Sequence, residues 1–165
     1  MSQILKPEPL THARFLPFGD VIEARTDKAF GINQGYTDRF HHLASIQLDD
    51  EGSGIISLFR GRSRDYPLPI TMLERHPLGS QAFMPLDNTP FLIVVAPPAD
   101  TPDPQQIRVF ISNGYQGVNY HRGVWHHPLL TGAPEQDFLV VDRTGAGNNC
   151  DEYYFLPEQI PLLVT

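Results

Sequence analysis

The sequence predicts an all-β protein, a sandwich or barrel built from many short strands. Sixteen prolines and 13 glycines interrupt the 165 residues at short intervals. The runs between them have the length of strands, are rich in β-branched and aromatic residues, and are bounded by turn residues. Few segments show the period of a helix, and short strands joined by Gly/Pro-rich turns are typical of sandwiches and barrels.

Six runs are predicted as strands: 54–59, 70–73, 81–86, 91–96, 107–112 and 137–141. The runs 91–96 and 138–141 are apolar on both faces, as expected for strands that are covered front and back. Short helices are expected at 11–16, where Thr11 is a suitable N-cap, at 102–106 and at 156–160. The sequence contains no repeat or linker, so residues 1–165 are predicted to form a single domain.

The composition is ordinary for a soluble globular protein, with 41% hydrophobic and 19% charged residues. The formal charge of −7 and the scattered basic residues argue against a nucleic-acid surface. The single cysteine, Cys150, cannot form an intrachain disulfide, and residues 1–9 lack a signal-peptide pattern. The longest apolar run, 91–98, is too short to span a bilayer. We therefore expect a cytoplasmic protein that binds a small molecule, and neither nucleic acid nor a membrane.

Two segments, 73–83 and 117–128, contain most of the residues suited to chemistry. Glu74 and His76 are two residues apart and share one face of a strand, and Pro77 keeps His76 extended. Gln81 follows a turn and can join the same face. Burying titratable groups is costly unless they are paired, ligated or hydrogen-bonded, so we expect both segments to contribute to one pocket.

The spacing of these residues resembles the two metal-binding motifs of cupin barrels. Glu74-x-His76 followed by Gln81 is similar to the first motif, His-x-His and then Glu, and Gly123-x-x-His126 is similar to the second. The resemblance implies a cupin-type β-barrel (a double-stranded β-helix, or jelly roll) with a few short peripheral helices. It also makes Glu74, His76, Gln81 and His126 candidate ligands of a divalent metal, although an amide oxygen is a weaker ligand. The alternative is a metal-free pocket with hydrogen-bonded polar groups.

Further candidates flank these motifs. His126 and His127 are adjacent and point to opposite faces, and the motif selects His126, leaving His127 on the surface or behind the site. Tyr120 and Asn119 are candidate hydrogen-bond donors, with turn or rim positions as the alternative. Arg143 follows an apolar strand and is a candidate clamp for a substrate carboxylate, with a structural ion pair as the alternative.

Nearly the whole chain resembles the ureidoglycolate lyase family. The matching stretches are 31–35, 39–41, 73–83, 116–121, 123–129, 137–139, 142–143 and 149–151. Glu74 and Gln81 depart from the general cupin pattern but agree with this family. The resemblance implies a homodimeric carbon–nitrogen lyase that converts (S)-ureidoglycolate to glyoxylate and urea in allantoin breakdown. It suggests nickel as the divalent metal and implies no organic cofactor.

Eliminating urea from ureidoglycolate needs a base for the hydroxyl proton and an acid for the departing nitrogen, and histidine or a desolvated glutamate can do both. The predicted catalytic residues are His76, Glu74, His126 and Tyr120. The predicted substrate-binding residues are Gln81, Asn119, His121 and Arg143. Arg75 should point away from the pocket. Two alternatives stay open: another small-acid cupin enzyme, such as a metal-dependent isomerase or dioxygenase, and a non-catalytic cupin ligand-binding module.

Overall fold

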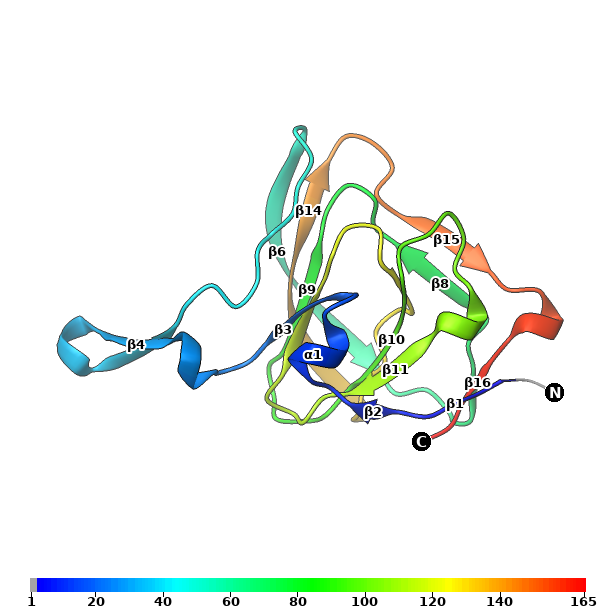
Figure 1. Ribbon diagram of the computed structural model, residues 1–165, viewed down its shortest axis with the longest axis horizontal. Helices are drawn as coiled ribbons and strands as arrows, with labels where there is room; N and C mark the ends of the chain where they lie inside the picture. The colour runs from blue at the N-terminus through cyan, green and yellow to red at the C-terminus, as the bar shows by residue number, and fades with distance from the viewer. Residues whose placement is uncertain (1–2) are drawn as a thin grey trace.

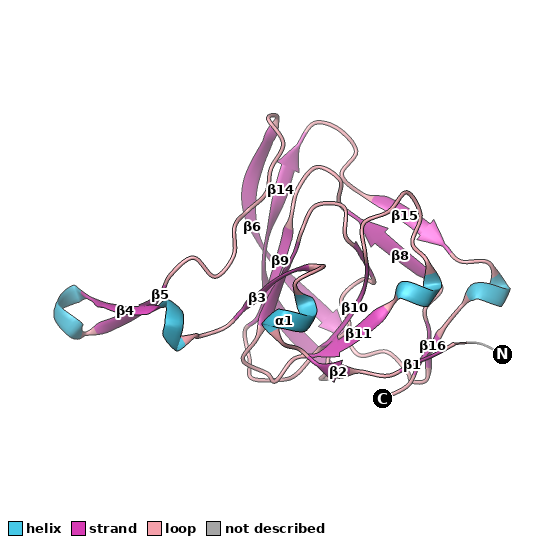
Figure 2. Ribbon diagram, in the orientation of Figure 1, coloured by secondary structure: helices cyan, strands magenta, loops and turns pink. Residues whose placement is uncertain are grey.

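The computed structural model describes residues 3–165, in which two β-sheets pack face to face as a jelly-roll barrel (Figures 1 and 2). Residues 1–2, part of the segment inspected for a signal peptide, lie outside the described range. The five-stranded sheet has the order β3 (Gly19–Ile22), β12 (Gly117–Tyr120), β9 (Gln81–Pro85), β14 (Glu135–Gly145) and β6 (Gly52–Arg62). The six-stranded sheet has the order β15 (Asp151–Tyr154), β8 (Met72–Arg75), β13 (Trp125–His126), β10 (Leu92–Ala96), β11 (Arg108–Ile111) and β2 (Glu8–Pro9).

Smaller elements surround the barrel. A three-stranded sheet has the order β1 (Ile4–Leu5), β16 (Leu162–Leu163) and β7 (Leu68–Pro69), and a separate hairpin pairs β4 (Ala29–Ile32) with β5 (Thr37–Phe40). Helix α1 (His12–Phe15) begins at Thr11, whose hydroxyl accepts a hydrogen bond from the backbone N–H of Arg14. Four 3-10 turns lie at Thr26–Lys28, Asn33–Gly35, Pro104–Gln106 and Pro157–Gln159. The predicted all-β class and its short peripheral helices are confirmed.

The barrel interior is apolar because alternate residues of each strand point into it. Phe83 of β9 and Phe138 of β14 are buried there, with ring centroids 6.3 Å apart. The prediction that 138–141 is covered on both faces is wrong. Leu139 and Val141, on the outer face of β14, are only partly buried.

Strand β10 is buried along its whole length, as predicted for 91–96. Ile93 and Val95 point into the barrel, whereas Val94 points to a second apolar cluster behind the six-stranded sheet. That cluster is closed by the C-terminal part of the chain, including Phe155 and Leu163. None of the helices in residues 3–165 is long and apolar enough to cross a membrane.

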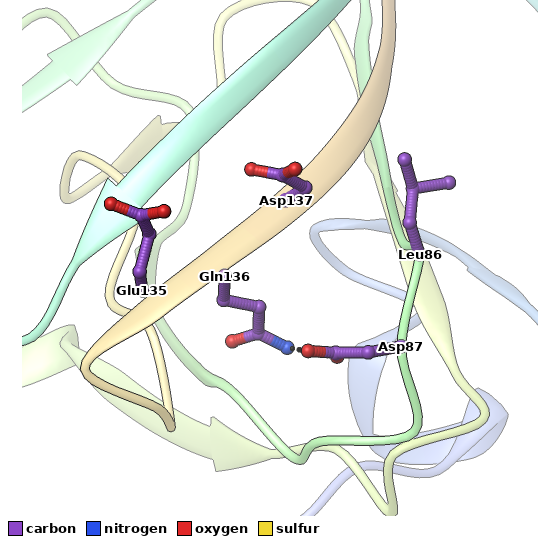
Figure 3. Close-up of a pocket in the computed structure, with 5 residues that line it drawn as sticks. All are labelled: Leu86, Asp87, Glu135, Gln136 and Asp137. Atoms are coloured by element: carbon purple, nitrogen blue, oxygen red, sulfur yellow. Dashed lines mark hydrogen bonds between the residues drawn. The ribbon is translucent and has the colours of Figure 1, made fainter.

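The two ends of the barrel differ in their polar groups. At the start of β14, a hollow is lined by Leu86, Asp87, Glu135, Gln136 and Asp137 (Figure 3). Its carboxylates are largely matched, because Asp137 binds the guanidinium of Arg60 and Asp87 accepts a hydrogen bond from Gln136. These carboxylates are therefore already occupied by protein partners. Near the other end of β14, by contrast, Oδ1 of Asp142 is buried and has no hydrogen-bond partner within residues 3–165.

Candidate active site

The structure brings together four residues that the sequence analysis selected. Glu74 of β8 lies directly opposite His126 of β13 in the six-stranded sheet. His76 follows the end of β8, and Gln81 begins β9 in the facing sheet. Donor atoms of Glu74, His76 and His126 all lie within 4.8 Å of one another. Two distant segments thus meet inside the barrel at a group that could hold a metal ion.

Both imidazoles are oriented by backbone carbonyls. Nδ1 of His76 donates to the carbonyl oxygen of Asn149 at 2.7 Å, and Nδ1 of His126 donates to that of Val124 at 3.2 Å. In a neutral imidazole the other nitrogen, Nε2, then carries the lone pair. The Nε2 atom of His126 lies 3.5 Å from Oε1 of Glu74, and the Nε2 atom of His76 lies 4.0 Å from the same oxygen. Fixing Nδ1 in this way is the usual arrangement of histidines that bind metals through Nε2.

Gln81 presents its amide oxygen to the same point. Its Nε2 donates to Oδ2 of Asp142 at 3.1 Å, which turns Oε1 toward Nε2 of His76, also at 3.1 Å. Because the proton of a neutral His76 sits on Nδ1, two hydrogen-bond acceptors, Nε2 of His76 and Oε1 of Gln81, then face each other. A cation beside them, either a metal ion or a second proton on His76, removes this repulsion.

The charges of the site favour an ionised Glu74 and a neutral His126. Burial raises the pKa of Glu74, but the imidazoles of His126 and His76 lower it by more, so the pKa of this carboxyl lies below its ordinary value. Burial lowers the pKa of His126, and the proximity of Glu74 only partly offsets this. At neutral pH the site therefore offers one carboxylate and an unprotonated imidazole nitrogen.

Tyr120 forms one wall of the site. Its ring stacks on the imidazole of His126, with centroids 4.3 Å apart and planes 12° from parallel. Burial and the negative charge of Glu74 raise the pKa of Tyr120 well above its ordinary value. The phenol therefore stays protonated, and its ring restricts the rotation of His126.

Two buried polar atoms in this region lack a hydrogen-bond partner within residues 3–165: Nε2 of His126 and Oδ1 of Asp142. Leaving such atoms unpaired is costly, so each indicates a binding position for a ligand atom. Ligands about 2.1 Å from one divalent ion lie roughly 3 to 4 Å apart, in line with the spacing of Glu74 from the two imidazoles. Two imidazoles, one carboxylate and one amide oxygen are a donor set that suits several divalent metals.

Two predicted substrate-binding residues, Asn119 and His121, lie in a different group. Strand alternation points Tyr120 into the barrel and its neighbours to the outer face of β12. Both outer side chains bind Oδ2 of Asp20, at 3.0 Å from Asn119 and 2.9 Å from His121. The amide of Asn119 also donates to the carbonyl oxygen of Ser45. Asn119 and His121 therefore do not lie with the four residues grouped inside the barrel.

Arg143 is engaged in an ion pair, the alternative considered for it. Its guanidinium binds both carboxylate oxygens of Asp49, at 2.6 and 3.0 Å, and donates to the carbonyl oxygen of Ala146. Its side chain is 1% exposed, and a Cβ at Gly79 would lie 2.8 Å from the Cβ of Arg143. Arg143 thus fixes a loop beside the site, on the strand face opposite Asp142. Arg75 points away from the pocket, as predicted, toward Asp151.

Several contributors were not selected from the sequence. Asp142 shares the inward face of β14 with Val140, so alternation along that strand could have identified it. The other two contributors are the backbone carbonyl groups of Asn149 and Val124, which no pattern of side chains in the sequence could identify. Glu74 also forms a group of potential ligands with Cys150 and Glu152. Partial burial and nearby carboxylates raise the pKa of Cys150 above its ordinary value, so the thiol stays protonated and is a weak ligand.

His127 is buried, so a surface position for it is wrong. Its Nδ1 donates to the carbonyl oxygen of Pro128 at 2.8 Å, and burial lowers the pKa of His127 to about 4. The unfolded chain binds this proton near pH 6.5, whereas the folded protein does so only near pH 4. The free energy of unfolding should therefore fall between these pH values, by about 3 kcal/mol from His127 alone.

Urea unfolding between pH 7 and pH 4 measures this dependence. His127→Leu should flatten it, because this variant has no imidazole to protonate at position 127. An equal slope in wild-type protein and His127→Leu would show that His127 is protonated in the fold.

Comparisons with known proteins place the chain in a family. The family model described as ureidoglycolate lyase matches residues 2–162. A ureidoglycolate lyase of Pseudomonas syringae pv. syringae (strain B728a) is 60% identical over 157 residues, covering 94% of this chain and 92% of that protein. One of Azotobacter vinelandii (strain DJ) is 56% identical over 162 residues, or 98% of each chain.

Among solved structures, a dTDP sugar isomerase of Desulfovibrio desulfuricans G20 matches 88% of this chain and 90% of its own. Its TM-score is 0.44 and its sequence identity is 17%, which is too low a similarity to inform fold or function. The family model and the curated relatives instead agree over nearly the full length of the sequence. The chain therefore belongs to the ureidoglycolate lyase family.

Proposed function

We propose that residues 1–165 form a single-domain ureidoglycolate lyase that cleaves (S)-ureidoglycolate to glyoxylate and urea. Membership of the family supports the reaction, and the cluster of Glu74, His76, Gln81 and His126 inside the barrel supports the place where it occurs. The observation that carries the proposal is that two buried atoms of the site, Nε2 of His126 and Oδ1 of Asp142, have no hydrogen-bond partner within residues 3–165. They offer a small polar ligand one acceptor at each side of the site.

The chemistry requires one proton to move within the substrate. The reacting carbon carries a hydroxyl, a carboxylate and the urea nitrogen. Loss of the hydroxyl proton allows a C=O bond to form while the C–N bond breaks, and the departing nitrogen gains a proton to give urea. Glu74 is ionised and suits the first transfer, and the resulting carboxylic acid can return the same proton to nitrogen. The balance needs neither water nor an oxidant.

The other residues of the site position the reactants. Asp142 Oδ1 is placed to accept an N–H of the urea group, while Tyr120 keeps the imidazole of His126 in place. A divalent metal would be held by Glu74, His76, Gln81 and His126, and would acidify the substrate hydroxyl and orient the carboxylate.

The identity of the metal, the oligomeric state and the cellular compartment are inferred from the resemblance to the family. We infer nickel as the metal, a homodimer as the functional form, and the cytoplasm as the compartment, where the reaction would serve allantoin breakdown. The exposed free thiol of Cys150 supports a reducing compartment.

Product analysis tests the reaction directly. Incubation with (S)-ureidoglycolate should release glyoxylate and urea in equal amounts, at a rate far above the spontaneous one. Release of ammonia in place of urea would indicate an amidohydrolase, and no turnover would overturn the proposal. Elemental analysis of protein prepared without a metal-affinity tag, before and after chelation, tests the cofactor separately. About one nickel per chain is expected.

A further inference from the structure

Asn149 holds the segment around His76 in two ways. Its backbone carbonyl oxygen accepts a hydrogen bond from Nδ1 of His76 at 2.7 Å, and its side-chain Oδ1 accepts one from the backbone N–H of Leu78 at 2.8 Å. The two contacts lie two residues apart on the segment that follows β8. One residue therefore grips both the ring of His76 and the backbone just beyond it.

The loop that carries Asn149 lies on the surface. Residues 146–150 connect β14 to β15, and all of them except Asn149 are exposed. Gly147 has a φ of 87°, in the left-handed region that favours glycine. Within residues 3–165, the hydrogen bonds that join this loop to residues 76–78 are both made by Asn149. An exposed loop thus supplies a contact to a histidine of the candidate site, and the side chain of Asn149 anchors it there.

Two acceptors compete for the single proton of a neutral His76. Nδ1 faces the carbonyl oxygen of Asn149 at 2.7 Å, and Nε2 faces the amide oxygen of Gln81 at 3.1 Å. A neutral imidazole has one N–H, so it can donate to only one of these oxygens. The amide of Gln81 is kept from turning over, because its Nε2 donates to Oδ2 of Asp142. The acceptor that takes the proton decides which ring nitrogen keeps the lone pair.

The shorter contact, to Asn149, favours the tautomer with its proton on Nδ1. The lone pair then lies on Nε2, which faces the interior of the site 4.0 Å from Oε1 of Glu74. If the carbonyl of Asn149 moved away, Gln81 would be the remaining acceptor and the proton would move to Nε2. Nε2 would then have no lone pair to offer a metal ion or a substrate proton.

We propose that Asn149 is a positioning residue that fixes the tautomer of His76 and so keeps Nε2 available to a ligand. The side chain provides the anchor, because Oδ1 binds the N–H of Leu78 and keeps the carbonyl of the same residue against Nδ1. The proposal rests on the proposed function in one respect, that His76 belongs to the reacting site. Its own content is the position of one proton.

The nitrogen chemical shifts of the His76 imidazole report this position, in protein without metal or substrate and at a pH where the ring is neutral. Wild-type protein should carry the proton on Nδ1, and Asn149→Ala should carry it mainly on Nε2. Asn149→Asp should restore the wild-type tautomer, because it keeps an oxygen to accept the N–H of Leu78. Within residues 3–165, the amide nitrogen of Asn149 makes no hydrogen bond that this variant would lose.

Zinc affinity, measured by calorimetry, is a second readout. Loss of a contact that orients a metal-binding histidine typically costs 10- to 100-fold in affinity, so Asn149→Ala should bind zinc about 10- to 100-fold more weakly than wild-type protein. Asn149→Asp should bind it within a few fold of wild type. Asn148→Ala is the matched control, because this neighbouring side chain binds only Cys150 and Asp151 within residues 3–165. It should retain both the tautomer and the affinity.

Far-UV circular dichroism checks folding, and Asn149→Gln, which displaces the amide oxygen by one methylene group, replaces Asn149→Ala if that variant unfolds. A proton on Nε2 in wild-type protein, a proton still on Nδ1 in Asn149→Ala, or equal zinc affinity in these two proteins would each overturn the proposal. So would the same losses in Asn148→Ala, or a failure of Asn149→Asp to restore the tautomer. Because neither readout is turnover, the lyase reaction could fail its own test while this role of Asn149 stands, and the reverse is equally distinguishable.

Discussion

Replacing His126 by alanine should lower kcat by about 10³-fold or more and abolish tight metal binding. His126 is 2% exposed, its Nδ1 is held by Val124, and its Nε2 has no hydrogen-bond partner within residues 3–165. Removing the ring deletes one donor of the site and leaves the ring of Tyr120 without its stacking partner. We expect the same direction of change for His76→Ala. Steady-state kinetics and metal content per chain measure both effects.

His121→Ala is the matched control for this experiment. It removes an imidazole from the same segment, but one that binds Asp20 on the outer face of β12. It should retain kcat within a few fold of the wild-type value. Near-normal turnover in both His126→Ala and His76→Ala would disprove the site, whereas a large loss in His121→Ala would return the group around Asp20 to the catalytic machinery.

Replacing Arg143 by methionine should lower the free energy of unfolding by more than the loss of an exposed ion pair does. The guanidinium is buried and bidentate on Asp49, so its loss leaves a partly exposed carboxylate without its counter-ion and removes the buried stem of the side chain. The pKa of Asp49, now lowered by this guanidinium, should rise toward its ordinary value. Urea denaturation measures the first effect, and NMR titration of the carboxyl carbon measures the second.

Arg60→Met is the matched control, because Arg60 makes the same bidentate contact with Asp137 on the open surface. Exposed pairs contribute little to stability, so this variant should unfold almost as wild-type protein does. If Arg143→Met and Arg60→Met lowered the free energy of unfolding equally, burial of the Arg143 guanidinium would not make its ion pair more stabilising than the exposed one. If Arg143→Lys raised KM alone and left stability intact, the role of substrate clamp would be restored.

The sequence was sufficient for the fold class and for the convergence of four residues. Strand alternation around Glu74 and His76 and the resemblance to cupin motifs both depend on local spacing, which one sequence contains. The same rule, applied to β12, would have separated Tyr120 from Asn119 and His121, since neighbours in a strand face opposite ways. That separation was missed because all three were considered as one cluster.

Other features depend on pairings between distant segments. The partner of Arg143 is Asp49, 94 residues away, and the orientation of His76 depends on a backbone carbonyl 73 residues away. Neither leaves a pattern in the local sequence. The projection of residues 29–40 away from the barrel (Figure 1) could not be predicted either, because a hairpin that lies on its barrel and one that leaves it have the same alternation.

The chain between the β4–β5 hairpin and β6 runs beside the candidate site. The backbone N–H of Gln47 donates a hydrogen bond to the hydroxyl of Ser80, and the side-chain oxygen of Gln47 accepts one from the backbone N–H of Arg122. Two residues later, the carboxylate of Asp49 binds the guanidinium of Arg143. The segment from Gln47 to Asp49 therefore contacts three segments that each adjoin a residue of the candidate site: Ser80 beside Gln81, Arg122 before His126, and Arg143 beside Asp142. Substitutions in this short stretch can adjust the geometry of the site without changing any residue that could hold a metal.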